Sequence, residues 1–258
     1  MTSWRLIPLL DGPGSMQMAI DSWLLQQYQQ GHPPTLRFYT WTPAALSLGF
    51  SQRKRIPPHW HSLHWQGNPI DLVQRPSGGR GVLHQGDLTY ALVTDRPSLN
   101  RQVSYQALCQ FLIVGWAQFG VHLNFGKPYR PYMGSSNCFE LATTADLVDE
   151  FGNKFIGSAQ YYQQERVLQH GSMLLKPDIQ LFHQAFGKKP PTVPSLSQRL
   201  ATPPLAEVIG EVIAALIEAA EHCFTAEFQV KPLTSQEWAE IKALAAANAQ
   251  SIRSEARE

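Results

Sequence analysis

Residues 74–90 read QRPSGGRGVLHQGDLTY, and this glycine-rich stretch is the most informative part of the chain. Three glycines fall within four positions, Gly78 and Gly79 among them, and glycine allows a backbone to approach a ligand closely. Exposed amides in such a loop suit a carbonyl or phosphate oxygen, and Arg75 and Arg80 add positive charge. A glycine bulge that joins two strands and leaves both arginines in solvent explains the stretch equally well.

Strand patterns flank this stretch at residues 70–74 and 88–94. Further strands are predicted at residues 35–41, 45–50, 146–151, 154–160 and 167–175. Helical periodicity predicts helices at residues 15–30, 103–119, 178–186, 204–224 and 234–247. The last of these begins with Thr234-Ser235-Gln236-Glu237, which matches a capping box. The mixture of elements indicates an α+β domain.

The chain is predicted to contain a catalytic domain at residues 1–187, a linker and a small helical C-terminal extension. The linker, residues 188–204, holds five prolines and shows no periodicity. The extension, residues 205–258, is predicted to consist of helices that pack back on the domain.

Composition excludes several classes of protein. The 258 residues are 43% apolar and 10% aromatic, which is typical of a folded chain with a large core. The formal net charge of +1 gives no general attraction to nucleic acid or to an anionic membrane, and we expect neither as a partner. No run of 18 apolar residues occurs, and the N-terminus shows no signal-peptide core. Three scattered cysteines favour a reducing, cytoplasmic location.

Several standard motifs are absent from the sequence: a P-loop, a complete dinucleotide fingerprint, a nucleophile elbow and a zincin pair of histidines. His59, His61 and His64 lie close together and are a candidate metal site. Because no carboxylate or cysteine accompanies them, we interpret them as a polar loop and predict no metal site.

A second informative region runs from Cys138 to His170. Cys109 and Cys223 fall in helical patterns as small core residues, whereas Cys138 follows the turn-rich Met133-Gly134-Ser135-Ser136. A thiol needs a nearby cation or base to become a useful nucleophile, and Lys154 and His170 are the candidates. On chemistry alone, an inert loop cysteine remains the alternative.

Taken together, these segments resemble the superfamily of lipoate–protein ligases, octanoyltransferases and biotin–protein ligases. The resemblance covers about residues 4–175 and rests on the order and spacing of four motifs. These are Asp11-Gly12-Pro13-Gly14 with the following helix, Leu36-Arg37-Phe38-Tyr39-Thr40-Trp41, the stretch from Arg75 to Tyr90, and Lys154-Phe155-Ile156-Gly157-Ser158-Ala159-Gln160. Cys138-Phe139-Glu140 is similar to the pattern of octanoyltransferases that use a cysteine upstream of the lysine motif. Biotin ligation is disfavoured because Gly79-Arg80-Gly81 is only part of the loop it needs.

The resemblance implies a central mixed β-sheet flanked by helices, with an acyl tunnel beside the glycine loop. It makes Cys138 the nucleophile and Lys154 the group that holds the acyl carbonyl oxygen. The residues implied to line the substrate site are Arg75, Gly78, Gly79, Arg80, His84, Gly157, Ser158, Ala159 and His170. Two departures stand out: Gln85 replaces the acidic residue that often follows the loop histidine, and the C-terminal part is smaller than in ligases.

The expected function is transfer of an octanoyl or lipoyl group from an acyl carrier protein, through a cysteine thioester, to a lysine of a lipoyl-domain protein. The expected acceptor is a glycine-cleavage H protein or a dehydrogenase E2 subunit, and no cofactor is required. One alternative is an ATP- and Mg-dependent lipoate–protein ligase that makes an acyl-adenylate. Another is a non-catalytic protein that binds lipoyl domains or an acyl ligand.

Overall fold

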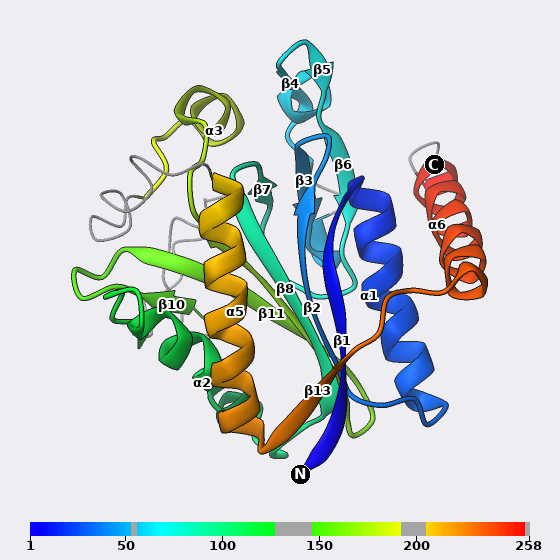
Figure 1. Cartoon of the computed structure of the whole chain (residues 1–258). Coiled ribbons are helices and arrows are strands. Elements are labelled where there is room, and N and C mark those ends of the chain that lie inside the picture. The colour runs from blue at the N-terminus through cyan, green and yellow to red at the C-terminus, as the bar shows by residue number, and fades with distance from the viewer. Residues whose placement is uncertain (53–55, 127–145, 192–204, 256–258) are drawn as a thin grey trace.

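The computed structural model describes residues 1–52, 56–126, 146–191 and 205–255. Within them, eight strands form one mixed sheet in the order β13-β1-β2-β8-β12-β11-β10-β9 (Figure 1). Their bounds are β1 Thr2–Gly12, β2 Thr35–Trp41, β8 Asp87–Asp95, β9 Asn124–Phe125, β10 Asp146–Val148, β11 Lys154–Gln163, β12 Arg166–Leu174 and β13 Ala226–Val230. Strands β13, β1 and β2 run parallel, and the remaining neighbours are antiparallel. The predicted α+β fold with a central mixed sheet is confirmed.

Helices cover both faces of this sheet (Figure 1). Helices α2 (Arg101–Ala117) and α5 (Leu205–Phe224) pack together over one face. Helix α1 (Gly14–Gln29) lies against the other face, and α6 (Ser235–Glu255) packs on α1. Helix α5 buries Val208, Val212, Leu216 and Ala219, which recur at the spacing that the sequence predicts for one apolar face.

A second, smaller sheet lies beside the main one and has the order β6-β3-β7. Its strands are β3 Ala45–Leu48, β6 Asp71–Gln74 and β7 Val82–His84. The connection between β3 and β6 contains two short 3₁₀ helices, Phe50–Gln52 and Pro58–Ser62, and the ribbon of β4 (His64–Trp65) and β5 (Asn68–Pro69). Helix α3 (Ile179–Phe186) shares a separate hydrophobic cluster with this small sheet. The glycine-rich stretch therefore joins β6 to β7 rather than two strands of the main sheet.

The C-terminal residues complete the main sheet. Strand β13, which was not predicted from the sequence, follows α5 and precedes α6 in the chain, and it pairs in parallel with β1. Arg5 of β1 forms an ion pair with Glu237 at 2.7 Å and donates to the carbonyls of Lys231 and Pro232. Thr234 and Glu237 exchange the two hydrogen bonds of the predicted capping box. The division at residues 188–204 stays a prediction, because 192–204 lie outside the described residues.

Candidate active site

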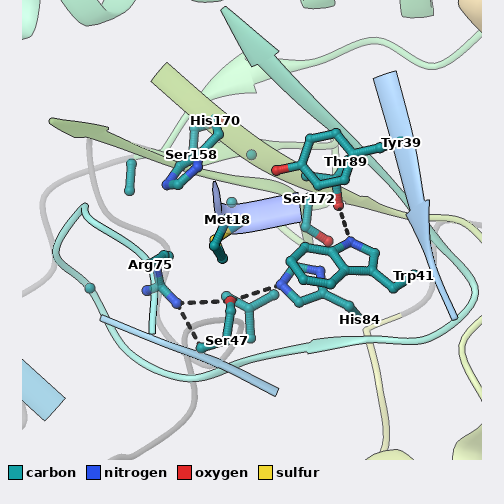
Figure 2. A pocket seen from close by; sticks show the side chains of 15 residues that line it. Met18, Tyr39, Trp41, Ser47, Arg75, His84, Thr89, Ser158, His170 and Ser172 are labelled. Atoms are coloured by element: carbon teal, nitrogen blue, oxygen red, sulfur yellow. Dashed lines mark hydrogen bonds between the residues drawn. The ribbon is translucent and has the colours of Figure 1, made fainter. Parts of the chain in front are cut away.

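A pocket opens between the main sheet and the small sheet, on the face that carries α1 (Figure 2). Its lining comes from α1, both sheets and the glycine-rich loop. The lining residues are Met18, Tyr39, Trp41, Ser47, Arg75, Gly79, Val82, His84, Thr89, Gly157, Ser158, Ala159, His170, Gly171 and Ser172. Apolar side chains therefore meet a concentrated set of buried polar groups in one concave site, which is typical of a small-molecule pocket.

On the small-sheet side, a continuous hydrogen-bonded chain begins at Arg75 (Figure 2). The Nη1 of Arg75 donates to the Ser47 backbone carbonyl at 2.7 Å and to Ser47 Oγ at 3.1 Å. Ser47 Oγ lies 2.8 Å from Nε2 of His84, and Nδ1 of His84 lies 2.8 Å from Oδ2 of Asp87. Burial lowers the pKa of His84 in spite of the Asp87 carboxylate, so its imidazole is neutral at pH 7.

Trp41 fixes the orientation of this histidine. The two rings stack with centroids 3.8 Å apart and an interplanar angle of 15°. The indole Nε1 donates to Thr89 Oγ1 at 2.8 Å (Figure 2). Thr89 in turn donates to Asp87. Rotation of the His84 ring would break the stack and both ring hydrogen bonds.

A second histidine lies across the pocket. His170 of β12 contacts Oδ2 of Asp21 through Nδ1 at 2.8 Å and contacts Ser77 Oγ through Nε2. Asp21, fully buried in α1, also accepts a hydrogen bond from Tyr39 and pairs with Arg37 at 3.0 Å. Burial raises the pKa of Tyr39 well above its usual value, so this phenol stays a hydrogen-bond donor. Helix α1 is thereby tied to the pocket wall.

Lys154 lies next to the pocket, although it is not one of the lining residues. Its Nζ forms an ion pair with Asp146 at 2.7 Å, and both side chains are almost fully buried. A Cβ at Gly157 would lie 2.9 Å from Lys154 Cε and 3.2 Å from Nζ. The end of the Lys154 side chain therefore occupies the space that a side chain at the pocket-lining Gly157 would need, so a larger residue at 157 would displace it.

Arg75 holds the glycine-rich loop in shape. Its guanidinium donates to the carbonyls of Gly78 and Arg80 as well as to Ser47. Gly79 has φ +96°, and a Cβ there would lie 2.8 Å from Arg75 Nη2. A Cβ at Gly78, in contrast, meets nothing within 4 Å. Of the adjacent pair Gly78 and Gly79, therefore, only Gly79 has to be glycine.

The structure brings most of the predicted site residues together. Those that line the pocket are Arg75, Gly79, His84, Gly157, Ser158, Ala159 and His170. Gly78 and Arg80 do not line it; they are exposed and half-buried respectively, and each offers its carbonyl to Arg75. Lys154 approaches from behind Gly157, and Cys138 lies outside the described residues.

Several pocket residues were not found from the sequence: Met18, Tyr39, Trp41, Ser47, Thr89 and Ser172, with Asp87 behind them. For some of these residues the sequence does contain a recognisable pattern. Asp87 and Thr89 alternate with apolar residues at the start of β8, and Thr89 pairs with Ser172 on the neighbouring strand. Buried polar side chains at a spacing of two residues mark the face of a sheet that lines a site.

The side chain of Gln85, the residue that departs from the family pattern, bonds to the backbone near α3 and not to His84. Its Oε1 accepts a hydrogen bond from the amide of Asp178, at the start of α3. The carboxylate beside His84 comes from Asp87 instead.

The histidine-rich loop lies elsewhere. The Nε2 of His59 contacts the carbonyl of Ala185, and Nδ1 of His64 contacts that of Ser62. Within the described ranges, no three His, Cys, Asp or Glu side chains are arranged to hold a metal ion. Nor does any helix of those ranges have the length and apolarity needed to cross a membrane.

Burial makes both cysteines of the described residues weaker nucleophiles than an exposed thiol, and Cys109 is inaccessible as well. Burial raises the pKa of Cys109 to about 12, and burial also raises that of the half-buried Cys223. Cys109 lies in the core and accepts a hydrogen bond from Gln169.

We expect Cys109 in the folded protein to resist iodoacetamide at pH 8 for times at which Cys223 is fully alkylated. A buried thiol with a pKa of about 12 is both protonated and inaccessible. Peptide mapping by mass spectrometry measures both sites, with urea-unfolded protein as the control in which both react. Alkylation of folded Cys109 at the rate of Cys223 would contradict this assignment.

Solved structures with the same fold identify the class of this architecture. The chain matches a crystal structure of lipoate–protein ligase A bound with ATP at a TM-score of 0.73 and 22% identity, covering 95% of this chain and 94% of that one. It matches a bipartite lipoate protein ligase from Thermoplasma acidophilum at a TM-score of 0.69 and 22% identity, with coverages of 95% and 93%. The fold is that of the lipoate–protein ligases.

Sequence comparison assigns the chain to a protein family. It belongs to the lipoyl protein ligase A/B catalytic domain family, whose match spans residues 13–217. A relative from Carboxydothermus hydrogenoformans named octanoyltransferase LipM is 36% identical over 184 residues, which is 69% of this chain and 67% of that protein. A relative of the same name from Halalkalibacterium halodurans is 32% identical over 270 residues, 95% of each chain. The expected family is thus confirmed.

Proposed function

We propose that this protein is an acyltransferase of protein lipoylation that moves an octanoyl group from a carrier thioester to a lysine of a lipoyl domain. Its family and relatives named octanoyltransferase support this reaction. The observation that carries it is the pocket, where Met18, Trp41 and Val82 offer apolar surface for an acyl chain. Lys154, behind Gly157, supplies a cation close to the polar wall.

In the proposed mechanism the Cys138 thiolate attacks the carbonyl carbon of the donor thioester. The C–S bond to the carrier breaks, the carrier sulfur leaves as a thiolate that takes up a proton from water, and an enzyme thioester remains. A neutral lysine amine of the acceptor then attacks this thioester and loses a proton, while the Cys138 thiolate departs. The product is an amide, which is more stable than a thioester, so neither ATP nor another cofactor is needed.

Both steps pass through a tetrahedral intermediate with a negatively charged oxygen. A preorganised cation or amide donor near this oxygen lowers the barrier more than it stabilises the bound substrate. Lys154 is suited to this task because the buried Asp146 fixes its position. A free, solvated lysine would first have to be ordered.

The proposal includes an acyl carrier protein as donor and an H protein or E2 subunit as acceptor. It also includes a cytoplasmic location, supported by the low cysteine content of the sequence. These partners would provide the thioester and the lysine that the mechanism needs.

A transfer assay tests the function. The protein is incubated with an octanoylated carrier protein and an unmodified lipoyl domain without ATP, and parallel reactions contain octanoic or lipoic acid with ATP and Mg²⁺. We expect octanoylation of the lipoyl-domain lysine only with the carrier thioester. Modification only with free acid and ATP would establish a ligase, and binding without modification in either reaction would establish a non-catalytic protein.

Gly79→Ala is expected to reduce this transfer at least about tenfold while the protein stays folded. The positive φ of Gly79 disfavours alanine by about 1–2 kcal/mol, and the new methyl group displaces the Arg75 guanidinium from the pocket wall. Gly78→Ala is the matched control, because its Cβ has free space. Transfer rates and melting temperatures of both variants provide the measurement. Equal activity of the two variants would place the acyl site away from the loop.

A further inference from the structure

Two Ser–His–Asp chains border the pocket, and they have the same connectivity. In one, Ser47 Oγ contacts Nε2 of His84 at 2.8 Å, and Nδ1 of His84 contacts Asp87 at 2.8 Å. In the other, Ser77 contacts Nε2 of His170, whose Nδ1 contacts Asp21. The two chains differ in their access to the pocket: Ser47 lines it, whereas Ser77 does not.

The direction of each proton in the Ser47 chain follows from its neighbours. Oδ2 of Asp87 accepts hydrogen bonds from the hydroxyls of Thr89, at 3.0 Å, and Ser172, at 2.6 Å. A carboxylate that accepts these bonds also accepts from Nδ1–H of His84, which leaves the lone pair of Nε2 facing Ser47. Ser47 therefore donates its proton to the histidine, as a serine nucleophile does toward its general base.

A cation adjoins the same serine oxygen. Nη1 of Arg75 donates to Ser47 Oγ at 3.1 Å, so a guanidinium faces the oxygen on which negative charge develops as the proton leaves. In addition, Trp41 stacks on His84 and holds its ring in the plane required for both hydrogen bonds. Nucleophile, base and orienting carboxylate are thus preorganised, with a stabilising charge beside them.

We propose that Ser47 is a second nucleophile of this protein and that the Ser47–His84–Asp87 chain hydrolyses activated medium-chain acyl esters and thioesters bound in the pocket. This activity goes beyond the proposed acyl transfer and does not depend on Cys138. The geometry assigns the role to Ser47 rather than Ser77 because only Ser47 faces the space in which an acyl group fits.

The reaction has two steps, with water as the second reactant. Ser47 Oγ attacks the acyl carbonyl carbon while Nε2 of His84 takes the hydroxyl proton. The bond from the carbonyl carbon to the leaving oxygen or sulfur breaks, and the leaving group receives that proton from His84. Water then attacks the acyl-serine ester, His84 again relays the proton, and the fatty acid leaves as Ser47 is regenerated.

An alkyl fluorophosphonate that carries an octyl chain tests the nucleophile directly. The experiment uses the full chain with Cys138→Ala, so that a cysteine thioester cannot contribute and failure of the proposed acyl transfer leaves the result unaffected. Intact-mass spectrometry is expected to show one adduct, and peptide mapping should place it on Ser47 and not on Ser77. His84→Gln in the same background should slow labelling by about 100-fold, because general-base catalysis commonly contributes this much. Absence of an adduct, an adduct on another residue, or an unchanged labelling rate in His84→Gln would overturn the proposal.

Hydrolysis of p-nitrophenyl octanoate gives a second, independent readout in that background. Ser47→Ala should lower the hydrolysis rate at least about tenfold, with melting curves to confirm that it is folded. Ser62→Ala is the control, since Ser62 is an exposed serine of a short 3₁₀ helix outside the pocket, and it should keep the full rate. Equal rates in the two folded variants would contradict a role for Ser47.

Discussion

Lys154→Arg is expected to lower the rate of octanoyl transfer about as far as Lys154→Ala, on the order of 10²–10³-fold. The Lys154 ammonium occupies a confined position, 2.7 Å from Asp146 and in the space that a Cβ at Gly157 would need. A guanidinium is larger, planar and differently hydrated, so it cannot place one donor at that point. Charge alone would not restore the geometry that the oxyanion requires.

The two Lys154 variants should differ in stability although they share low activity. Alanine leaves the Asp146 carboxylate buried without the Lys154 ammonium, which costs about 3–5 kcal/mol in comparable pairs. Arginine keeps the positive charge and should lose less. Steady-state transfer rates and urea unfolding of both proteins measure the two effects separately. Transfer by Lys154→Arg within a few-fold of wild type would show that charge suffices and that Lys154 does not position the carbonyl.

Cys138→Ser is expected to abolish transfer, with a loss on the order of 10⁴-fold, because the unit that forms the covalent intermediate is removed. Serine has nearly the same shape, but its hydroxyl is a far weaker nucleophile than a thiolate without a dedicated base. Cys223→Ser is the matched control and should retain transfer, since burial raises the pKa of the half-buried Cys223 thiol and keeps it protonated. Transfer by Cys138→Ser at the wild-type rate would rule out the cysteine thioester.

Long elements with strong periodicity could be predicted from the sequence. The helices at 14–29, 101–117 and 205–224 lie within two residues of their predicted limits, because each carries apolar residues at helical spacing that it buries. The last helix extends further, to Glu255, than the predicted end at residue 247. Its start was predictable because the capping box is a local interaction.

Short strands could not be predicted in the same way. Strand β13 has only five residues, three of them exposed, and it is stabilised by pairing with β1 more than 200 positions earlier in the chain. The N-terminal strand β1 was missed as well: its central residues, Trp4 to Ile7, are all buried, so it lacks the alternation of a strand with one exposed face. Such strands depend on tertiary contacts rather than on local pattern.

The site residues likewise fall into two groups, those that a local sequence pattern reveals and those that only the tertiary structure brings together. Gly79 and Arg75 were predictable because a glycine cluster with basic neighbours is visible within one stretch of sequence, and the family resemblance added His84. Ser47 and Trp41 come from separate strands and reach the pocket only through the pairing of β3 with β7 and of β2 with β8. A lone serine or tryptophan in a strand carries no mark of this role.

The central claim, a covalent acyl-enzyme formed without ATP, is tested most directly by intact-mass spectrometry. The wild-type protein is mixed with octanoylated carrier protein in the absence of ATP and acceptor, and its mass is followed over time. We predict a gain equal to one octanoyl group in place of one hydrogen, mapped by peptide analysis to Cys138 and discharged when an unmodified lipoyl domain is added. An unchanged mass under conditions in which the lipoyl domain does become octanoylated would contradict the account.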